Sequence, residues 1–198
     1  MLVLEDFTDR LTKRVNFVVG YELTQVMSII REIAAYQALS LSTTEQPYAP
    51  EIEGLHEILS EIVITCWGAI ESKNHPWFTP EVKETVLGWS TPEALLKLQT
   101  DVSEEGVSPV LVHRDLWPNN MLFERSSKAS GEGVVLAILD WQAAGVGPCM
   151  LDVASILGVT MSTESRVAHT HTVLQYYFDQ ILSHKDKFIR PFELTLEK

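Results

Sequence analysis

The chain has 198 residues, 45% of them hydrophobic, so it is large enough to bury a core. Its formal net charge of −12, from 27 acidic and 15 basic residues, argues against non-specific binding to nucleic acid or to an anionic membrane. The two cysteines, Cys66 and Cys149, lack the spacing of a disulfide framework or a zinc site, and no apolar run reaches membrane-spanning length. These features predict a cytoplasmic protein.

The chain opens with the apolar residues Met1–Leu4, followed by the acidic residues Glu5 and Asp6. This pattern predicts a short strand that ends in two carboxylates, and a plain edge strand is one interpretation of it.

Helices are predicted through most of residues 9–105. Apolar residues at helical spacing predict the first helix over Tyr21–Leu41, and we expect it to serve the core. Thr79-Pro80-Glu81 and Thr91-Pro92-Glu93 each place a capping residue before a proline, which is typical of a helix start.

A second long helix is predicted over about residues 51–70. Its apolar residues share one side: Leu55, Ile58, Leu59, Ile62, Val63 and Cys66. Three tryptophans in this region, Trp67, Trp77 and Trp89, favour packing in the core or at its rim over a ligand cage.

Residues 110–139 predict strands that alternate with polar loops. The strands are Val110–Val112, Met121–Phe123 and residues 134–139, and a turn-rich tip over residues 126–133 joins the last two as a hairpin. Gly145-Val146-Gly147 is interpreted as a turn, and a helix is predicted from Val153 after a turn at Asp152.

Three polar residues lie where these strands end: Asp115, Asn120 and Asp140. In a folded hairpin Asn120 lies near Asp140, and Asp115 lies on the loop just before them. Carboxylate and amide oxygens suit Mg²⁺, which takes its remaining ligands from water and phosphates. The spacing His-x-Asp-x-x-x-x-Asn, followed by a strand that ends in Asp, is the kinase catalytic arrangement. In this arrangement Asp115 would be the general base, and Asn120 and Asp140 would hold the metal ions.

His113-Arg114-Asp115-Leu116-Trp117-Pro118-Asn119-Asn120 and Ile138-Leu139-Asp140-Trp141-Gln142 resemble the CHK kinase-like proteins, also called ecdysteroid kinase-like, and especially their nematode members. These proteins lie within the aminoglycoside phosphotransferase and choline kinase branch of the protein-kinase-like fold. Asp152-Val153-Ala154 matches the Asp-Leu-Ala element of that branch. Trp141-Gln142 stands where protein kinases have Phe-Gly, and no Ala-Pro-Glu follows.

The resemblance implies an α+β, mainly helical fold: the C-terminal lobe of a kinase-like protein with a small catalytic β-hairpin. Leu4, Glu5 and Asp6 would form the hinge that meets the adenine of ATP. His113 would hold the loop to the strand after Asp140, and Asp152 would hydrogen-bond the backbone of the loop. No glycine-rich phosphate loop with its lysine is found, so we expect the N-terminal lobe to be missing and the chain alone to bind ATP weakly.

Residues 161–198 predict a C-terminal helix over Glu164–Leu182 and a charged tail. The apolar set of this helix is Val167, Val173, Leu174, Tyr177, Phe178 and Ile181. His169 and His171 are two residues apart and point to different faces of a helix, which argues against a metal site there.

The whole chain is thus interpreted as one partial domain. It has a hinge region (residues 1–8), a helical part (9–105), a catalytic and metal-binding segment (106–160) and a C-terminal helix with its tail (161–198). The expected activity is transfer of phosphate from ATP, with Mg²⁺, to the hydroxyl of a small-molecule alcohol. The alternative is an inactive remnant of a kinase that acts as a binding or regulatory module.

Overall fold

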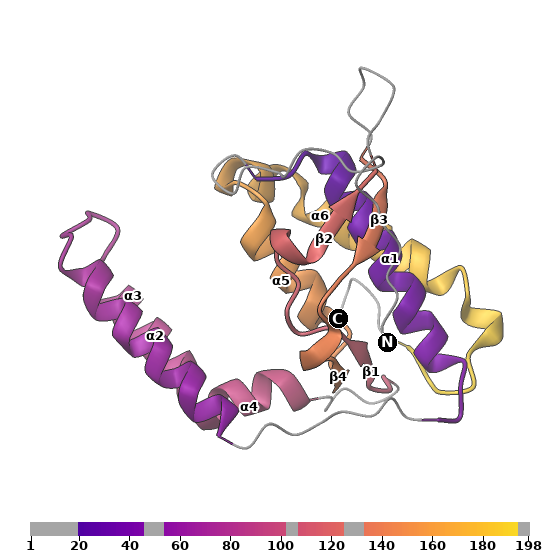
Figure 1. The fold of residues 1–198 in the computed structure, drawn as a ribbon, viewed down its shortest axis with the longest axis horizontal. Helices are drawn as coiled ribbons and strands as arrows, with labels where there is room; N and C mark the ends of the chain where they lie inside the picture. The colour runs from indigo at the N-terminus through magenta and orange to yellow at the C-terminus, as the bar shows by residue number, and fades with distance from the viewer. Residues whose placement is uncertain (1–19, 46–53, 102–106, 125–132, 194–198) are drawn as a thin grey trace, which may run out of the picture. The chain divides into compact units, whose positions relative to one another are not determined.

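A computed structural model describes residues 20–45, 54–101, 107–124 and 133–193 (Figure 1). The chain divides into two compact units, residues 1–49 with 102–198 and residues 50–101, and each is described by itself. The strand and hinge predicted at Met1–Asp6 lie outside the described residues. The helical part predicted over residues 9–105 is divided between the two units.

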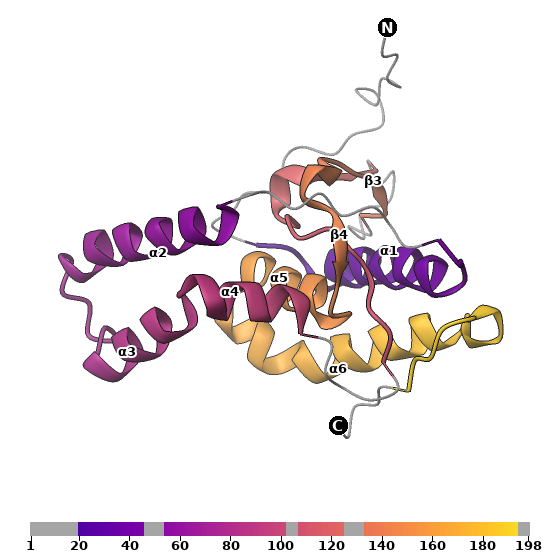
Figure 2. The ribbon, with the colours of Figure 1, turned by 90° about the horizontal axis from the view of Figure 1, so that it is seen from below.

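The larger unit is built on three helices, α1 (Leu23–Leu41), α5 (Met150–Thr160) and α6 (Thr163–Leu182). Helix α1 lies between α6 on one side and the strand β3 (Val135–Ile138) on the other (Figure 2). The apolar spacing predicted the buried face of α1: Val26, Ile30, Ile33, Ala34, Ala38 and Leu41 are fully buried or nearly so, and Leu23 and Met27 are partly buried. Ile29, which was not predicted, is fully buried as well.

Two small antiparallel sheets complete this unit. Strand β2 (Met121–Phe123) pairs with β3, which confirms the predicted hairpin, and β1 (Val110–Val112) pairs with β4 (Gly145–Gly147). The turn predicted at Gly145–Gly147 was therefore wrong. The two glycines pair with Val112 and Val110, and this tertiary pairing overrides the local turn preference of glycine.

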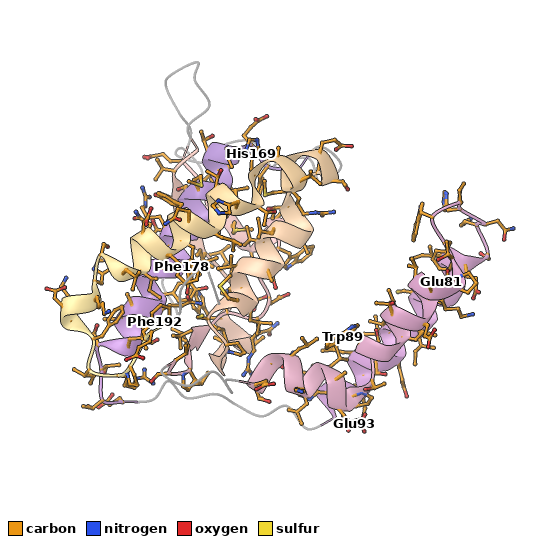
Figure 3. All side chains as sticks on the ribbon, turned by 180° about the vertical axis from the view of Figure 1, so that it is seen from behind. Glu81, Trp89, Glu93, His169, Phe178 and Phe192 are labelled. Carbon is orange, nitrogen blue, oxygen red and sulfur yellow. The ribbon has the colours of Figure 1, made fainter. Side chains whose placement is uncertain are left out.

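The C-terminal helices differ from their predicted bounds by a few residues. Asp152 lies in the first turn of α5 rather than in a turn before the helix, and a carboxylate is favourable at that end of the helix dipole. On α6, Val173 and Phe178 are buried as predicted, but Val167 is 85% exposed. Figure 3 labels Phe178 on this helix. Val167 lies near the N-terminal end of α6, only about 20° around the helix from Phe178, so it continues the line of the buried stripe. Its exposure means that the packed core does not extend to this end of the helix.

The smaller unit consists of α2 (Leu55–Glu71), α3 (Pro80–Trp89) and α4 (Pro92–Thr100). The predicted helix starts are confirmed, because the hydroxyls of Thr79 and Thr91 accept hydrogen bonds from backbone amides in the first turns of α3 and α4. Trp89, at the end of α3, is exposed (Figure 3).

The apolar side predicted for α2 was correct only in part, because Leu55, Leu59 and Val63 are partly buried. Ile58 and Ile62 are about half exposed, whereas Ser60 and Trp67 are buried, and Trp67 stacks on Phe78 with ring centroids 4.1 Å apart. Ile58 and Ile62 each lie two residues from Ser60, about 160° around the helix, so they face away from the buried stripe. None of the helices in the described part of the chain is long and apolar enough to cross a membrane.

Candidate functional site

The segment from His113 to Asn120, called the site loop below, connects β1 to β2. It brings two of the predicted site residues into direct contact, because the side-chain amide of Asn120 donates to Oδ2 of Asp115 at 3.0 Å and to its main-chain oxygen at 2.9 Å. Carboxylate and carbonyl oxygens only accept hydrogen bonds, so the nitrogen of the Asn120 amide must face Asp115. The amide oxygen, the atom of this side chain that binds cations, is left outside these two bonds.

Asp140 directly follows Leu139, whose backbone is hydrogen-bonded on both sides to the site loop. The Leu139 N–H donates to the main-chain oxygen of Asn120 at 2.8 Å, and the Leu139 oxygen faces Nε2 of His113 at 2.8 Å. The side chain of Asp140 is exposed. The strand ends that carry Asn120 and Asp140 are thus adjacent, as the hairpin prediction required.

Two residues of this region have left-handed backbone conformations. Arg114 has φ 69° and Asp140 has φ 61°, and among the described residues the other non-glycine residue with positive φ is Asn74, in the smaller unit. Asparagine and aspartate adopt this conformation comparatively readily, whereas for Arg114 it costs of order 1 kcal/mol. Such strain is concentrated at functional sites, where the surrounding contacts maintain it.

His113 is fully buried and bridges the two strand ends. Its Nδ1 accepts the Asp115 amide at 3.3 Å while Nε2 faces the Leu139 oxygen, so the neutral ring with its proton on Nε2 satisfies both contacts. The contact is to Leu139, just before Asp140, rather than to the strand after Asp140 as predicted. Leu139 is already held beside the loop by the bond from its N–H to the Asn120 oxygen, so its own oxygen is within reach of His113.

Asp152 is fully buried, and its carboxylate accepts three hydrogen bonds. The amide of His113 donates to Oδ2 at 2.7 Å, the amide of Arg114 to Oδ1 at 3.0 Å, and the Tyr36 hydroxyl to Oδ2 at 2.6 Å. The predicted bonds from Asp152 to the loop backbone are therefore present. They hold the backbone of the site loop in place just before Asp115.

The side chain of Arg114 contacts β4 rather than a carboxylate of the predicted metal set. Its Nη2 donates to the Val146 oxygen at 2.8 Å. Burial lowers the pKa of Arg114, and the charge of Asp152 opposes that shift. The positive charge therefore lies next to the buried carboxylate that supports the loop.

Polar residues on and just before α1 form hydrogen bonds to the strands and loops around the site, and none of them was predicted as a site residue. Each of four side chains forms one hydrogen bond to a strand or loop of the larger unit: Tyr21 to the Pro118 oxygen, Ser28 to the Val135 amide, Gln37 to the Cys149 oxygen and Ser40 to the Leu111 amide. Ser28, Gln37 and Ser40 are buried. The signal that would have identified them is a polar residue at a position where the helical period predicts an apolar one.

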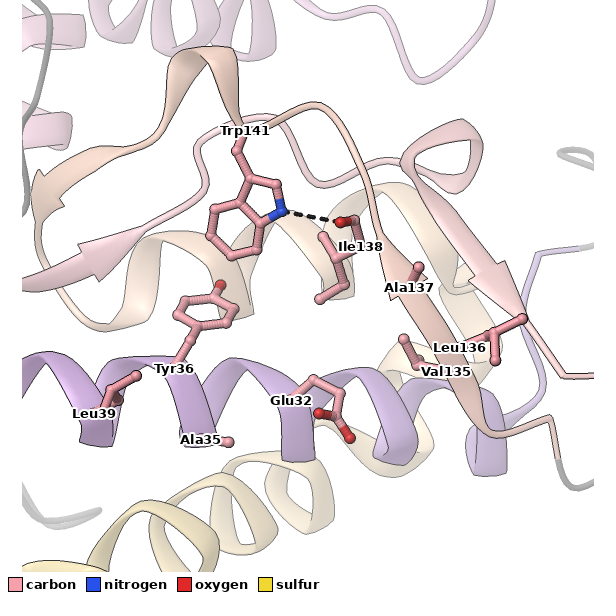
Figure 4. Close-up of a pocket in the computed structure, with 9 residues that line it drawn as sticks. All are labelled: Glu32, Ala35, Tyr36, Leu39, Val135, Leu136, Ala137, Ile138 and Trp141. Atoms are coloured by element: carbon pink, nitrogen blue, oxygen red, sulfur yellow. Dashed lines mark hydrogen bonds between the residues drawn. The ribbon is translucent and has the colours of Figure 1, made fainter. Parts of the chain in front are cut away.

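A groove of about 400 Å³ lies between α1 and β3 (Figure 4). Tyr36 and Trp141 line it, whereas Asp115, Asn120 and Asp140 do not. This groove is therefore not the predicted metal site. Within the described residues, no group of three His, Cys, Asp or Glu side chains is placed to hold a metal ion; the predicted set consists of carboxylates and one amide.

The described residues define a mostly helical α+β protein in which a buried aspartate of α5 and a buried histidine hold an oxygen-rich loop beside a β-hairpin. Residues 4–196 match the family described as Uncharacterized oxidoreductase dhs-27 (DUF1679), and the chain belongs to that family. No curated protein and no solved structure matches the chain.

Proposed function

We propose that the chain carries the catalytic and metal-binding segment of an ATP-dependent phosphotransferase of the CHK kinase-like group, which acts on a small-molecule hydroxyl. One observation carries the proposal. Asn120 contacts Asp115 through its side chain and contacts Leu139, the neighbour of Asp140, through its backbone. The backbone segments that carry the three residues of the kinase-like motif are thus connected at one end of the hairpin.

The residues present fit a magnesium ion in chemical type. Two carboxylates and an amide oxygen are hard ligands, and Mg²⁺ completes its coordination with water and phosphate oxygens. Asn120 and Asp140 would hold the metal ion. When bound, it would neutralise the negative charge of the ATP phosphates. Leu4, Glu5 and Asp6, outside the described residues, stay the predicted contacts to adenine.

In this proposal Asp115 orients the acceptor hydroxyl and takes its proton. His113 and Asp152 act through the backbone of the site loop. Their bonds to the loop and to Leu139 fix the base relative to the metal ligands, and phosphoryl transfer depends mainly on such positioning.

The word oxidoreductase in the family description suggests a different chemistry. A dinucleotide-binding domain would place Gly-x-Gly-x-x-Gly between a strand and a helix of a parallel sheet. The 198 residues contain no such sequence, and the strand pairs of the described residues are antiparallel. The site therefore supports phosphate transfer better than hydride transfer. The intact trio Asp115, Asn120 and Asp140 favours an enzyme over a binding remnant.

The experiment that tests this function uses a fusion in which a related phosphotransferase supplies the phosphate-covering loop and its lysine upstream of residue 1. The fusion is incubated with Mg-ATP and a panel of small alcohols, and ³¹P NMR follows phosphomonoester formation. A parallel sample with the same alcohols and NAD(P)⁺ is followed by absorbance of the reduced nicotinamide. We expect a new phosphomonoester and no hydride transfer. Nicotinamide reduction without a phosphomonoester would overturn the proposal.

A further inference from the structure

The buried carboxylate of Asp152 receives its three donors from two different elements. Two are amides of the site loop, and the third is the hydroxyl of Tyr36 on α1. Tyr36 and the His113 amide share the same oxygen, Oδ2, at 2.6 and 2.7 Å. The orientation of this carboxylate is thus set jointly by α1 and by the loop that carries Asp115.

Tyr36 also contacts the segment on the other side of the site. Its ring meets that of Trp141, the residue after Asp140, edge to face at 5.2 Å (Figure 4), and the Trp141 ring lies 4.6 Å from the His113 ring. The Trp141 indole is held in turn by its bond to the Ile138 oxygen at 2.9 Å. One side chain of α1 therefore touches both the support of the site loop and the segment that follows Asp140.

We propose that Tyr36 is a positioning residue of this site. Its hydroxyl fixes the Asp152 carboxylate so that both oxygens meet the amides of His113 and Arg114, and its ring supports Trp141. The structural part of this inference stands on the contacts alone, and its consequence for catalysis rests on the proposed function.

Helix α1 is a suitable anchor for this role because more of its residues are buried than those of α5 or α6. Residue Gln37, next to Tyr36, is fully buried and accepts the Tyr177 hydroxyl at 2.6 Å. Hydrogen bonds from the protein replace the water that a buried carboxylate has lost. A carboxylate that loses one of these donors is held less firmly in one orientation. Burial and the neighbouring Asp152 raise the pKa of Tyr36 well above its ordinary value, so the hydroxyl keeps the proton that it donates.

The test compares Tyr36→Phe with a matched control, Tyr177→Phe, in the 198-residue chain. Both substitutions remove one tyrosine hydroxyl that donates to a fully buried side chain, but the bond of Tyr177 goes to Gln37 rather than to Asp152. Amide hydrogen exchange of His113 and Arg114 is measured by NMR relative to core amides of α6. We expect Tyr36→Phe to lower the relative protection of the two loop amides about 10-fold, and Tyr177→Phe to leave the ratio unchanged.

An unchanged protection ratio in Tyr36→Phe, or the same change in both variants, would overturn the inference. The second readout is kinetic and uses the fusion protein described above. A positioning role predicts a lower kcat with an unchanged KM for ATP in Tyr36→Phe, whereas equal kcat values would contradict it. Absence of transfer in the parent fusion counts against the proposed function, and the exchange measurement still decides the role of Tyr36.

Discussion

Replacement of Asp152 by alanine should lower the free energy of unfolding by about 3–5 kcal/mol, the range for breaking a buried charged pair or network. The substitution leaves two buried backbone amides and the Tyr36 hydroxyl without their acceptor. Each unsatisfied buried group costs about 1–3 kcal/mol. Urea denaturation followed by circular dichroism measures the effect.

The matched control is Asp186→Ala, which removes an exposed aspartate from the short 3₁₀ segment Lys185–Lys187. Exposed substitutions of this kind change stability by about 0.5 kcal/mol or less. A loss below about 1 kcal/mol in Asp152→Ala would contradict the role of this carboxylate as the common acceptor for the site loop and α1.

The second large effect concerns catalysis. In the fusion protein, Asp115→Asn should reduce phosphate transfer by about 10²–10⁴-fold, the contribution typical of a general base. Asparagine retains an oxygen that accepts the bond from the Asn120 amide, so the loop keeps its shape while the base is lost. Initial rates at saturating Mg-ATP measure the change.

Asp186→Asn is the control for this substitution, because it makes the same chemical change at an exposed position. It should leave the rate within experimental error. Activity of Asp115→Asn equal to that of the parent would show that another group accepts the proton.

The sequence predicted the hairpin and the position of its polar ends because local patterns govern both. Alternating apolar runs predicted β2 and β3, and their pairing brings Asn120 next to Leu139. The bonds of Asp152 to the loop were predicted through family resemblance, since 38 or more residues separate the partners and no local pattern connects them. Strand β4 was missed because its glycines favour a turn until β1 pairs with them.

The partners of the polar side chains of α1 could not be predicted from hydrophobic periodicity. Periodicity predicts which face of a helix is buried, and that prediction was correct for α1. It does not predict which buried polar atom meets which partner, as with Tyr36 and Asp152, more than 100 residues away. For α2 periodicity predicted the buried face only in part, because burial depends on which side of the helix its neighbour covers.

The most direct test of the proposed metal site is the binding of Mn²⁺, a paramagnetic substitute for Mg²⁺, to the 198-residue chain. Electron paramagnetic resonance follows the loss of the free Mn²⁺ signal, with Asp140→Asn compared against Asp186→Asn. Asparagine tolerates the φ of 61° at position 140, so Asp140→Asn removes the charge without straining the backbone. We predict that Asp140→Asn weakens Mn²⁺ binding at least about 10-fold while Asp186→Asn leaves it unchanged, consistent with losing one carboxylate ligand. Equal Mn²⁺ affinity in Asp140→Asn and the parent would contradict the assignment of Asp140 as a metal ligand.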